Sequence, residues 1–172
     1  VAAGFASYLS PGCSKVLALV DGAAVVIMGE APSPGIALSV HTAEGAELRA
    51  DSGASVLQVS SGAPRVSLHG LVLRSSVAVD GGELHVDSCI FDGGSLVVSG
   101  GKVTATDTQF VGDAIHLSAG GSLVYRLPAP LGHWINSLGQ DRLALTAGQS
   151  YVGYPHACSA GLFGAEATVE AQ

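Results

Sequence analysis

Charged residues are scarce in this chain of 172 residues: Lys, Arg, Asp and Glu together make up 12% of it, about half of the share in an average globular protein. Lys, Glu and Gln are strong helix formers, so their scarcity argues against a helical protein. Hydrophobic residues reach 48%, and there are 24 glycines. Disordered chains have few apolar residues and many charges, and this composition excludes that class. We predict an all-β protein with a sizeable hydrophobic core.

Basic residues and long apolar runs are also lacking. Seven Lys and Arg stand against fourteen Asp and Glu, which gives a net charge of -7. Binding to phosphate backbones depends on clustered Lys and Arg, so nucleic acid is not an expected partner. The longest apolar run, residues 23–28, has the length of a strand, whereas a membrane span needs about 20 apolar residues. We therefore expect no membrane insertion by this segment.

Only three cysteines are present, Cys13, Cys89 and Cys158, and no two of them have the C-x-x-C spacing of zinc ribbons or thioredoxin-like proteins. Cys89 lies in an apolar stretch, residues 86–91, where we expect a small buried side chain. Cys13 and Cys158 lie in loop-like surroundings and could form disulfides with partners outside this segment. Such disulfides would place the chain in an oxidising compartment, either extracellular or in an organelle lumen.

Several columns of apolar residues recur at one period. Val77, Leu96 and Ile115 are separated by steps of nineteen residues, and Phe91 and Phe110 are again nineteen apart. A further column recurs at steps of eighteen to twenty residues, and its members are Leu48, Val66, Leu84, Val103 and Leu123. Agreement among independent columns indicates a structural repeat.

Each repeat holds short strands in which apolar and polar residues alternate before a Gly, Ser or Asp. Such strands become stable when successive repeats stack, because each strand then pairs in parallel with its counterpart about 4.8 Å away. The predicted fold is an all-β, single-stranded parallel β-helix, or solenoid, of about five to seven short coils with an irregular C-terminal extension. Glycine pairs at 81–82 and 100–101 are expected where the chain turns between faces. Coil lengths that drift by one residue favour a right-handed coil.

Two prolines, Pro128 and Pro130, cannot continue a strand ladder, so we expect the β-helix to end near Leu127. Trp134, the single tryptophan, is the expected apolar anchor of the segment that follows. The predicted organisation is a cap or lead-in over residues 1–15, the β-helix over 16–127, and an irregular cap or linker over 128–157.

Two runs within the repeat, residues 57–73 (LQVSSGAPRVSLHGLVL) and 81–91 (GGELHVDSCIF), resemble the repeating signature of right-handed parallel β-helix proteins of the pectate-lyase-like superfamily. The resemblance extends over roughly residues 16–127 and implies the fold. It leaves the function open, because this superfamily includes pectin-degrading enzymes, phage tailspikes, adhesins and non-catalytic surface modules.

Residues 125–134 (YRLPAPLGHW) and 154–164 (YPHACSAGLFG) resemble a junction in large predicted extracellular proteins of unicellular algae. In those proteins a β-helix is followed by ephrin-receptor-like cysteine-rich modules. The resemblance implies that residues 158–172 are the start of such a module, with Cys158 as its first cysteine, and that the chain is a piece of a longer protein.

The carboxylates of the repeat do not form a catalytic column. Enzymes of the pectate-lyase-like type hold Ca²⁺, or perform acid and base catalysis, with aspartates clustered on one parallel face. In the repeat alignment Asp87 follows His69 and precedes Thr106, while Asp107 lies one position off that column. A pair formed by Asp87 and Asp107 would need diagonal reach, and isolated aspartates at strand ends more often cap turns. We therefore predict no catalytic residues.

The histidines do not indicate a metal site. They fall in different columns of the repeat or in separate segments of the chain: His41, His69, His85, His116, His133 and His156. Such positions do not converge as the ligands of a zinc site must, so we predict no metal-binding and no cofactor-binding residues. Glu83 and Lys102 share a column on neighbouring coils, and this register allows an ion pair between the coils.

Regular apolar stacking without a carboxylate column predicts a non-catalytic structural or interaction module. It would act as a rigid β-helix spacer or docking surface, and its partners would be other chains or domains of a larger assembly. The alternative is a polysaccharide-binding or polysaccharide-degrading β-helix of lyase or hydrolase type, with Asp87 and Asp107 lining a groove along one parallel face. An adhesin-like passenger on a bacterial surface would share the fold but would not supply the cysteine-bearing tail.

Overall fold

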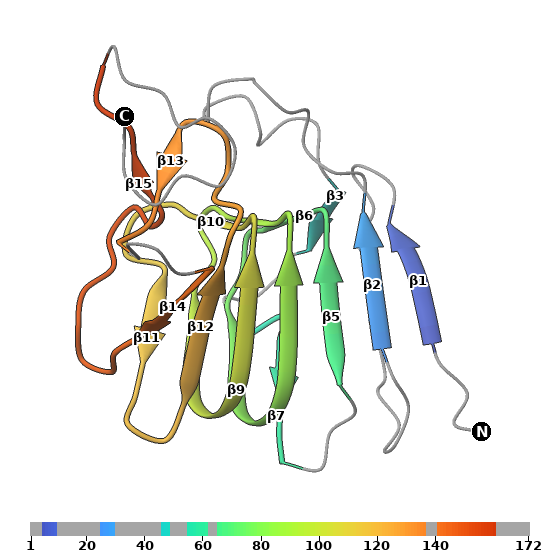
Figure 1. Cartoon of the computed structure of the whole chain (residues 1–172). Coiled ribbons are helices and arrows are strands. Elements are labelled where there is room, and N and C mark those ends of the chain that lie inside the picture. The colour runs from blue at the N-terminus through green and yellow to red at the C-terminus, as the bar shows by residue number, and fades with distance from the viewer. Residues whose placement is uncertain are drawn as a thin grey trace.

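The computed structural model (Figure 1) describes residues 55–61, 65–136 and 141–160 in full and three earlier strands by their backbone. Its strands are β1 (Phe5–Leu9), β2 (Val25–Gly29), β3 (Ala46–Leu48), β4 (Leu57–Val59), β5 (Val66–His69), β6 (Leu71–Leu73), β7 (Val77–Asp87), β8 (Ile90–Phe91), β9 (Leu96–Thr106), β10 (Gln109–Phe110), β11 (Ile115–Leu117), β12 (Ser122–Arg126), β13 (His133–Trp134), β14 (Arg142–Leu145) and β15 (His156–Ala157). The described residues form no helix, which confirms the all-β class. Accordingly, none of them belongs to a helix that could cross a membrane.

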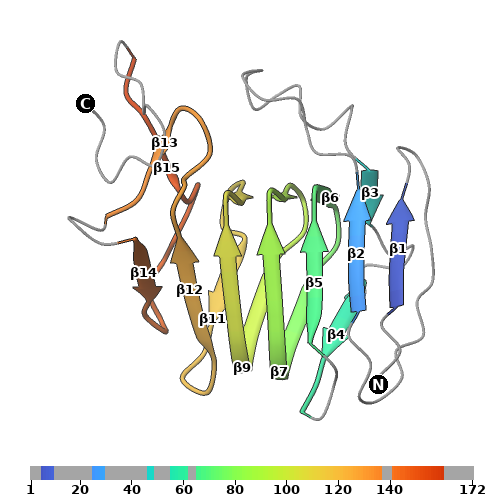
Figure 2. The same cartoon turned by 45° about the vertical axis from the view of Figure 1, so that its right-hand side comes forward.

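The strands wind around three faces of a β-solenoid of about four turns, as Figure 2 shows. Face 1 consists of β4, residues 77–79 of β7, residues 96–98 of β9, and β11. Face 2 consists of β1, β2, β5, residues 84–87 of β7, residues 103–106 of β9, and β12. Face 3 consists of β3, β6, β8 and β10. Neighbours within each face pair in parallel, as stacked repeats require. Among the described residues the structure shows about four turns, where five to seven coils were expected.

The apolar columns predicted from the period lie inside the solenoid. Val77, Leu96 and Ile115 are in register on neighbouring strands of face 1, and none of them is more than 2% exposed. Phe91 and Phe110 stack with their ring centroids 4.9 Å apart. Because full burial of one such side chain contributes about 1.5–3 kcal/mol, these columns supply much of the stability of the fold.

The second predicted column is confirmed for its four later members, which are in register on face 2 and at most 1% exposed: Val66, Leu84, Val103 and Leu123. The prediction that Leu48 begins this column is wrong. Leu48 lies opposite Leu73 on face 3, and the residue opposite Val66 is Val25. All three faces contain buried aliphatic residues, so an eighteen-residue step does not tell which face a residue occupies.

β7 and β9 both run through the corner between faces 1 and 2, and the two glycine pairs lie at this corner. Gly82 and Gly101 have φ values of 69° and 70°, in the left-handed region that glycine adopts without steric cost. A Cβ on Gly101 would lie 2.6 Å from the carbonyl carbon of Gly81, so the close stacking of the corners also requires glycine. The predicted role of the glycine pairs is confirmed.

The segment after β13 folds back on the last coil and covers its end on two faces. β14 pairs antiparallel with β12, and Tyr154 forms an antiparallel bridge with Phe110 of face 3. The ring of Tyr154 also packs edge to face against the fully buried Tyr125, with 5.5 Å between centroids. Trp134, the expected anchor, is only partly buried, whereas Ile135 is fully buried. Tyr154 and Ile135 therefore anchor this segment.

Candidate functional site

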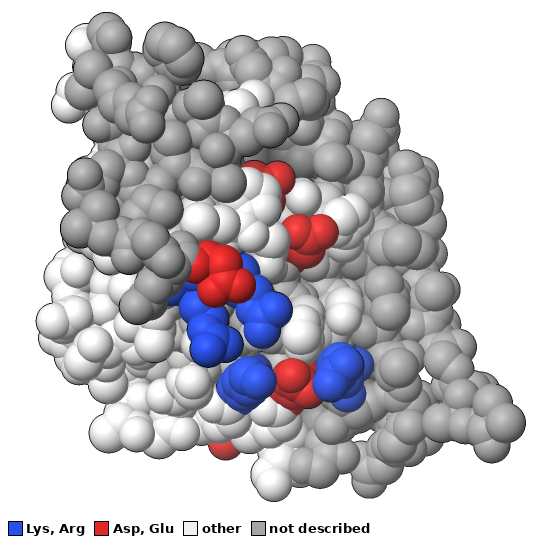
Figure 3. Space-filling view, in the orientation of Figure 1, with Lys and Arg blue, Asp and Glu red and all other residues white. Residues whose placement is uncertain are grey.

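Three acidic side chains are each paired with a basic side chain of the preceding coil. The pairs are Arg65 with Glu83, His69 with Asp87, and Arg74 with Asp92, and in each pair the partners are eighteen residues apart in the chain. The N–O distances are 2.9, 2.7 and 2.5 Å in that order. On face 2, acidic and basic side chains are interspersed on the surface, as Figure 3 shows. These contacts connect consecutive coils.

Glu83 lies opposite Lys102, which confirms the predicted register. Its carboxylate, however, bonds two other side chains: Arg65, and His85, whose Nε2 lies 3.0 Å from Glu83 Oε1. The pKa of Glu83 is lowered from its ordinary value. The hydrogen bond with His85 is the largest cause, and the hydrogen bond with Arg65 is the next. A carboxylate held in its charged form by two basic neighbours is suited to an ion pair rather than to proton transfer.

Asp87 and Asp107, the two aspartates of the alternative hypothesis, lie at the corner between faces 2 and 3. Asp87 ends β7 opposite Thr106, and Asp107 is the next residue after Thr106, so the predicted diagonal offset is confirmed. Asp107 Oδ2 accepts a hydrogen bond of 3.3 Å from Ser88 Oγ. Burial raises the pKa of Asp107, the Asp87 carboxylate raises it further, and the hydrogen bond from Ser88 opposes both. Asp107, at the corner between faces 2 and 3, thus has the raised pKa that enzymes give to a catalytic acid.

Asp107 also occupies a turn position that recurs in each coil. Three residues in the left-handed region share this position: Gly70 (φ 65°), Ser88 (φ 52°) and Asp107 (φ 46°). The backbone N–H of each donates a 3.1 Å hydrogen bond to a carbonyl oxygen one coil further on, namely those of Asp87, Thr106 and Pro128. Asp tolerates this conformation better than most residues. Turn geometry alone therefore accounts for an aspartate at this position.

The histidines of the repeat lie in different columns, as predicted. Their partners in register are Asp87 for His69, Thr104 for His85, and Val97 for His116. His41 lies outside the described residues. Within the described parts of the chain, His, Cys, Asp and Glu form no group of three or more that could hold a metal ion.

Cys89 is 1% exposed, as predicted, and burial raises the pKa of its thiol to about 12. Its Sγ lies 3.5 Å from the backbone N of Leu71, and one coil later Thr108 Oγ1 lies 3.5 Å from the backbone N of Cys89. The row ends at Tyr125, whose hydroxyl accepts from the N–H of Thr108 and donates to its carbonyl oxygen. Sequence analysis missed this internal polar row, although the nineteen-residue step from Cys89 to Thr108 was a signal for it.

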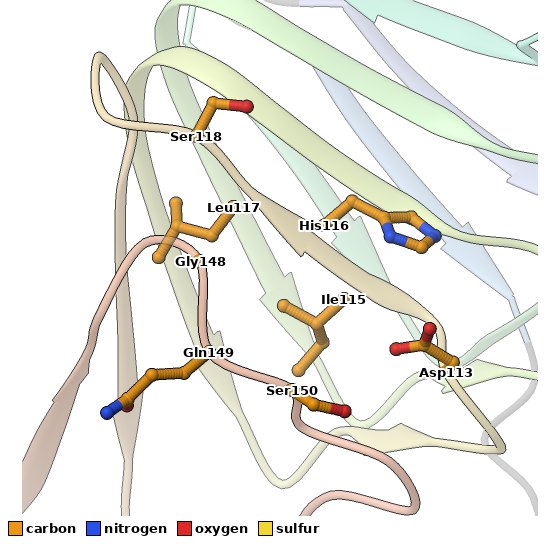
Figure 4. A pocket seen from close by; sticks show the side chains of 8 residues that line it. All are labelled: Asp113, Ile115, His116, Leu117, Ser118, Gly148, Gln149 and Ser150. Carbon is orange, nitrogen blue, oxygen red and sulfur yellow. The ribbon is translucent and has the colours of Figure 1, made fainter.

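An open depression of about 290 Å³ lies beside β11 at the C-terminal end of face 1. Figure 4 shows that one wall is β11 and the other is the loop of residues 148–150. Its lining residues are Asp113, Ile115, His116, Leu117, Ser118, Gly148, Gln149 and Ser150. Asp87 and Asp107 do not line it, so this hollow is not the groove that the polysaccharide hypothesis predicts.

Comparison of the chain with models of known protein families, with curated proteins and with solved structures found no match.

Proposed function

We propose that this chain is a non-catalytic structural or interaction module, a rigid β-helix spacer or docking surface within a larger assembly. The observation that supports this most is the pairing of Glu83, Asp87 and Asp92 with basic side chains one coil earlier. General acid and base catalysis requires a carboxyl group free to exchange its proton with a substrate. Carboxylates bonded between coils instead hold neighbouring repeats in register.

The same proposal includes the finer features inferred from resemblance. The coil is right-handed and of the pectate-lyase-like type, and the module lies outside the cytosol among other chains or domains of a larger assembly. Cys158 is a half-buried free thiol in the structure, and in an oxidising compartment it would pair with a cysteine beyond the described residues. Cys13 lies outside the described residues.

A polysaccharide-binding or polysaccharide-degrading β-helix is the second candidate function, and one observation favours it. Asp107 is half-buried beside Asp87 and has a raised pKa, which is the property that enzymes give to a general acid. Against this, the carboxylate of Asp87 is 2.7 Å from His69 Nδ1, and the turn explains the position of Asp107.

A cleavage assay separates the two candidates. The chain is incubated with polygalacturonate or alginate, with and without Ca²⁺, and unsaturated and reducing chain ends are measured. The proposed module releases neither kind of end, and Asp107→Ala changes nothing. Cleavage that is lost in Asp107→Ala but retained in the control Asp92→Ala, which removes a carboxylate paired with Arg74, would establish the enzyme and refute the module.

Rigidity is tested by the distance between two spin labels. Gln58 and Thr146 are exposed residues on the first and last parts of the chain described in full, and each is replaced by Cys in a chain whose Cys13 and Cys158 are Ser. A rigid spacer gives one narrow distance distribution by pulsed electron spin resonance. A broad distribution in a folded protein would contradict the spacer.

A further inference from the structure

The basic side chains are concentrated on one part of the surface, although the chain is acidic overall. Of the Lys and Arg side chains that the structure describes, all but Arg74 lie on or directly beside face 2. Arg65 bonds to Glu83. The others lie on β9, β12 and β14, which are neighbouring strands at the C-terminal end of this face, and they are exposed: Lys102, Arg126 and Arg142. Figure 3 shows Lys and Arg gathered over this part of the surface.

The outward side chains of these three strands include no carboxylate. Successive side chains of a strand point to opposite sides of the sheet, so the residues that alternate with the buried ones point outward. We call these outward residues the basic patch: Lys102, Thr104, Thr106, Ser122, Val124, Arg126, Arg142 and Ala144. Asp107 follows β9 and Asp141 precedes β14, so the nearest carboxylates in the sequence of these strands lie at its border. The polar groups of the basic patch are therefore cations and hydroxyl groups, which suit an anionic ligand.

Two cations of the basic patch are unpaired. Lys102 and Arg126 have no hydrogen bond or ion pair of their side chains among the residues that the structure describes. Glu83 lies opposite Lys102, but its carboxylate bonds to Arg65 and His85 instead. Both side chains are thus available to a ligand.

Arg126 and Arg142 lie directly opposite each other in the antiparallel pair of β12 and β14. The Cβ atoms of such residues are about 4.5–5.5 Å apart, and like charges at these positions repel each other. An anion that contacts both guanidinium groups offsets this repulsion, and carboxylates form strong, often bidentate hydrogen bonds with Arg. The Arg pair is therefore a position for one carboxylate.

The spacing of the cations fits an extended peptide. Lys102 lies opposite Ser122, and Arg126 is four residues further along the same strand, which is a separation of about 13 Å at about 3.3 Å per residue. In an extended peptide, alternate side chains lie on the same side about 6.6 Å apart, so the first, third and fifth side chains span this distance. The surface between the cations consists of short side chains that neighbour one another across the three strands: Thr104, Val124 and Ala144.

We propose that the basic patch is the docking surface for a short, extended, acidic segment of a partner protein. One carboxylate of the segment lies between Arg126 and Arg142, and another lies at Lys102. This inference rests on the proposed function as an interaction module, and it names the surface of the module and the chemistry of its partner.

The net charge of -7 favours a short occupant. At physiological ionic strength charges are screened over about 8 Å, so an acidic segment confined to the basic patch interacts mainly with the cations next to it. A long polyanion, such as a nucleic acid or an acidic polysaccharide, would extend over the acidic remainder of the chain and be repelled. The basic patch also contains no aromatic ring on which nucleic acid bases could stack.

The test compares two fluorescent peptides of the same composition, Asp-Thr-Asp-Thr-Asp and Thr-Asp-Asp-Asp-Thr, by anisotropy titration at physiological salt. When extended, the first peptide presents three carboxylates on one side, whereas the second presents at most two. We expect the alternating peptide to bind about fivefold or more tightly than the other. Equal affinities of the two peptides, or no binding of the alternating peptide, would overturn the docking surface.

Charge-matched variants locate the binding. Arg126→Gln and Lys102→Gln should each weaken binding of the alternating peptide about threefold or more. The control is Ser118→Glu, an exposed position after β11 of face 1, which lowers the net charge by the same amount and should change the affinity by less than about twofold. Urea unfolding should give the same midpoint for the wild type and the two patch variants, because neither side chain has a partner to lose. Equal weakening in the control would reduce the effect to overall charge and refute the patch.

Trigalacturonate separates a peptide partner from a carbohydrate partner, because it also carries three carboxylates. It should bind more weakly than the alternating peptide. If it binds more tightly, and Arg126→Gln removes that binding, the occupant is an acidic carbohydrate and the peptide partner is refuted. Failure of the peptide to bind refutes this docking surface and leaves the module proposal standing, since the cleavage assay and the spin-label distances test that proposal separately.

Discussion

Leu96→Ala should destabilise the protein by about 3–5 kcal/mol. Leu96 is fully buried and lies in register between Val77 and Ile115. Leu→Ala substitutions in cores cost about 2.7–5 kcal/mol, and the cost is highest where the surroundings cannot collapse into the cavity. Here the two neighbouring strands are held by parallel ladders at about 4.8 Å, so we expect the upper part of the range. In a chain of this length such a loss should lower the Tm by roughly 10 °C.

The assay is urea unfolding, followed by circular dichroism, of the wild type, Leu96→Ala and the control Val97→Ala. Val97 is the next residue on the same strand and is only partly buried, on the outward side of face 1. Its truncation should cost about 1 kcal/mol or less. Equal losses in the two variants, or a loss below about 1 kcal/mol for Leu96→Ala, would refute the argument that stacked columns hold this fold together.

Gly101→Ala should cost about 2 kcal/mol or more in urea unfolding, because φ is 70° and the new Cβ would lie 2.6 Å from the backbone of the preceding corner. In the control Gly112→Ala, φ is 66° and the new Cβ would meet no atom within 4 Å, so the cost should be only about 1 kcal/mol of backbone strain. Equal losses of stability in Gly101→Ala and Gly112→Ala would show that the corners are not closely stacked. For Asp107 the pKa is raised by burial, so the folded state binds the proton more tightly than the unfolded state, and stability falls as pH rises from about 4 through the raised pKa. Asp107→Asn should therefore have a higher melting temperature than the wild type at pH 7, and the difference in melting temperature should be smaller at pH 3. A wild type with the higher melting temperature at pH 7 would contradict this. The pKa of Cys89 is raised to about 12, so at pH 8 almost no thiolate is present, and mass mapping should show that a thiol reagent labels Cys158 but not Cys89 in the folded chain.

The interior of the solenoid could be predicted because its residues obey one period. Val77, Leu96 and Ile115 are alike in hydrophobicity and equally spaced, so a comparison of the chain with itself reveals which residues stack. Leu48 was misplaced for a physical reason: face 3 also contains buried aliphatic residues, such as its partner Leu73. Period alone cannot separate two faces that both contain such residues.

The surface was harder to predict because ion pairs leave a weaker pattern. The pairing of His69 with Asp87 has the same eighteen-residue step as the neighbouring pairs, and a search for opposite charges at that spacing would have found it. The environment of Asp107 required the structure, because its pKa depends on burial and on the hydroxyl of Ser88. Gly70, at the equivalent position one coil before Ser88, was the sequence signal that this position is a left-handed turn.

The way the solenoid ends follows from the packing of its last described coil. The column that holds Val86 and Ala105 on face 2 ends at Tyr125, and the small Ala105 leaves room beneath a large ring. Tyr125 and Tyr154 together fill the space that aliphatic residues of a further coil would occupy. Because β14 then runs antiparallel to β12, the strand that closes face 2 cannot lead into another parallel coil in the same register. Parallel stacking of the described coils therefore stops at faces 2 and 3.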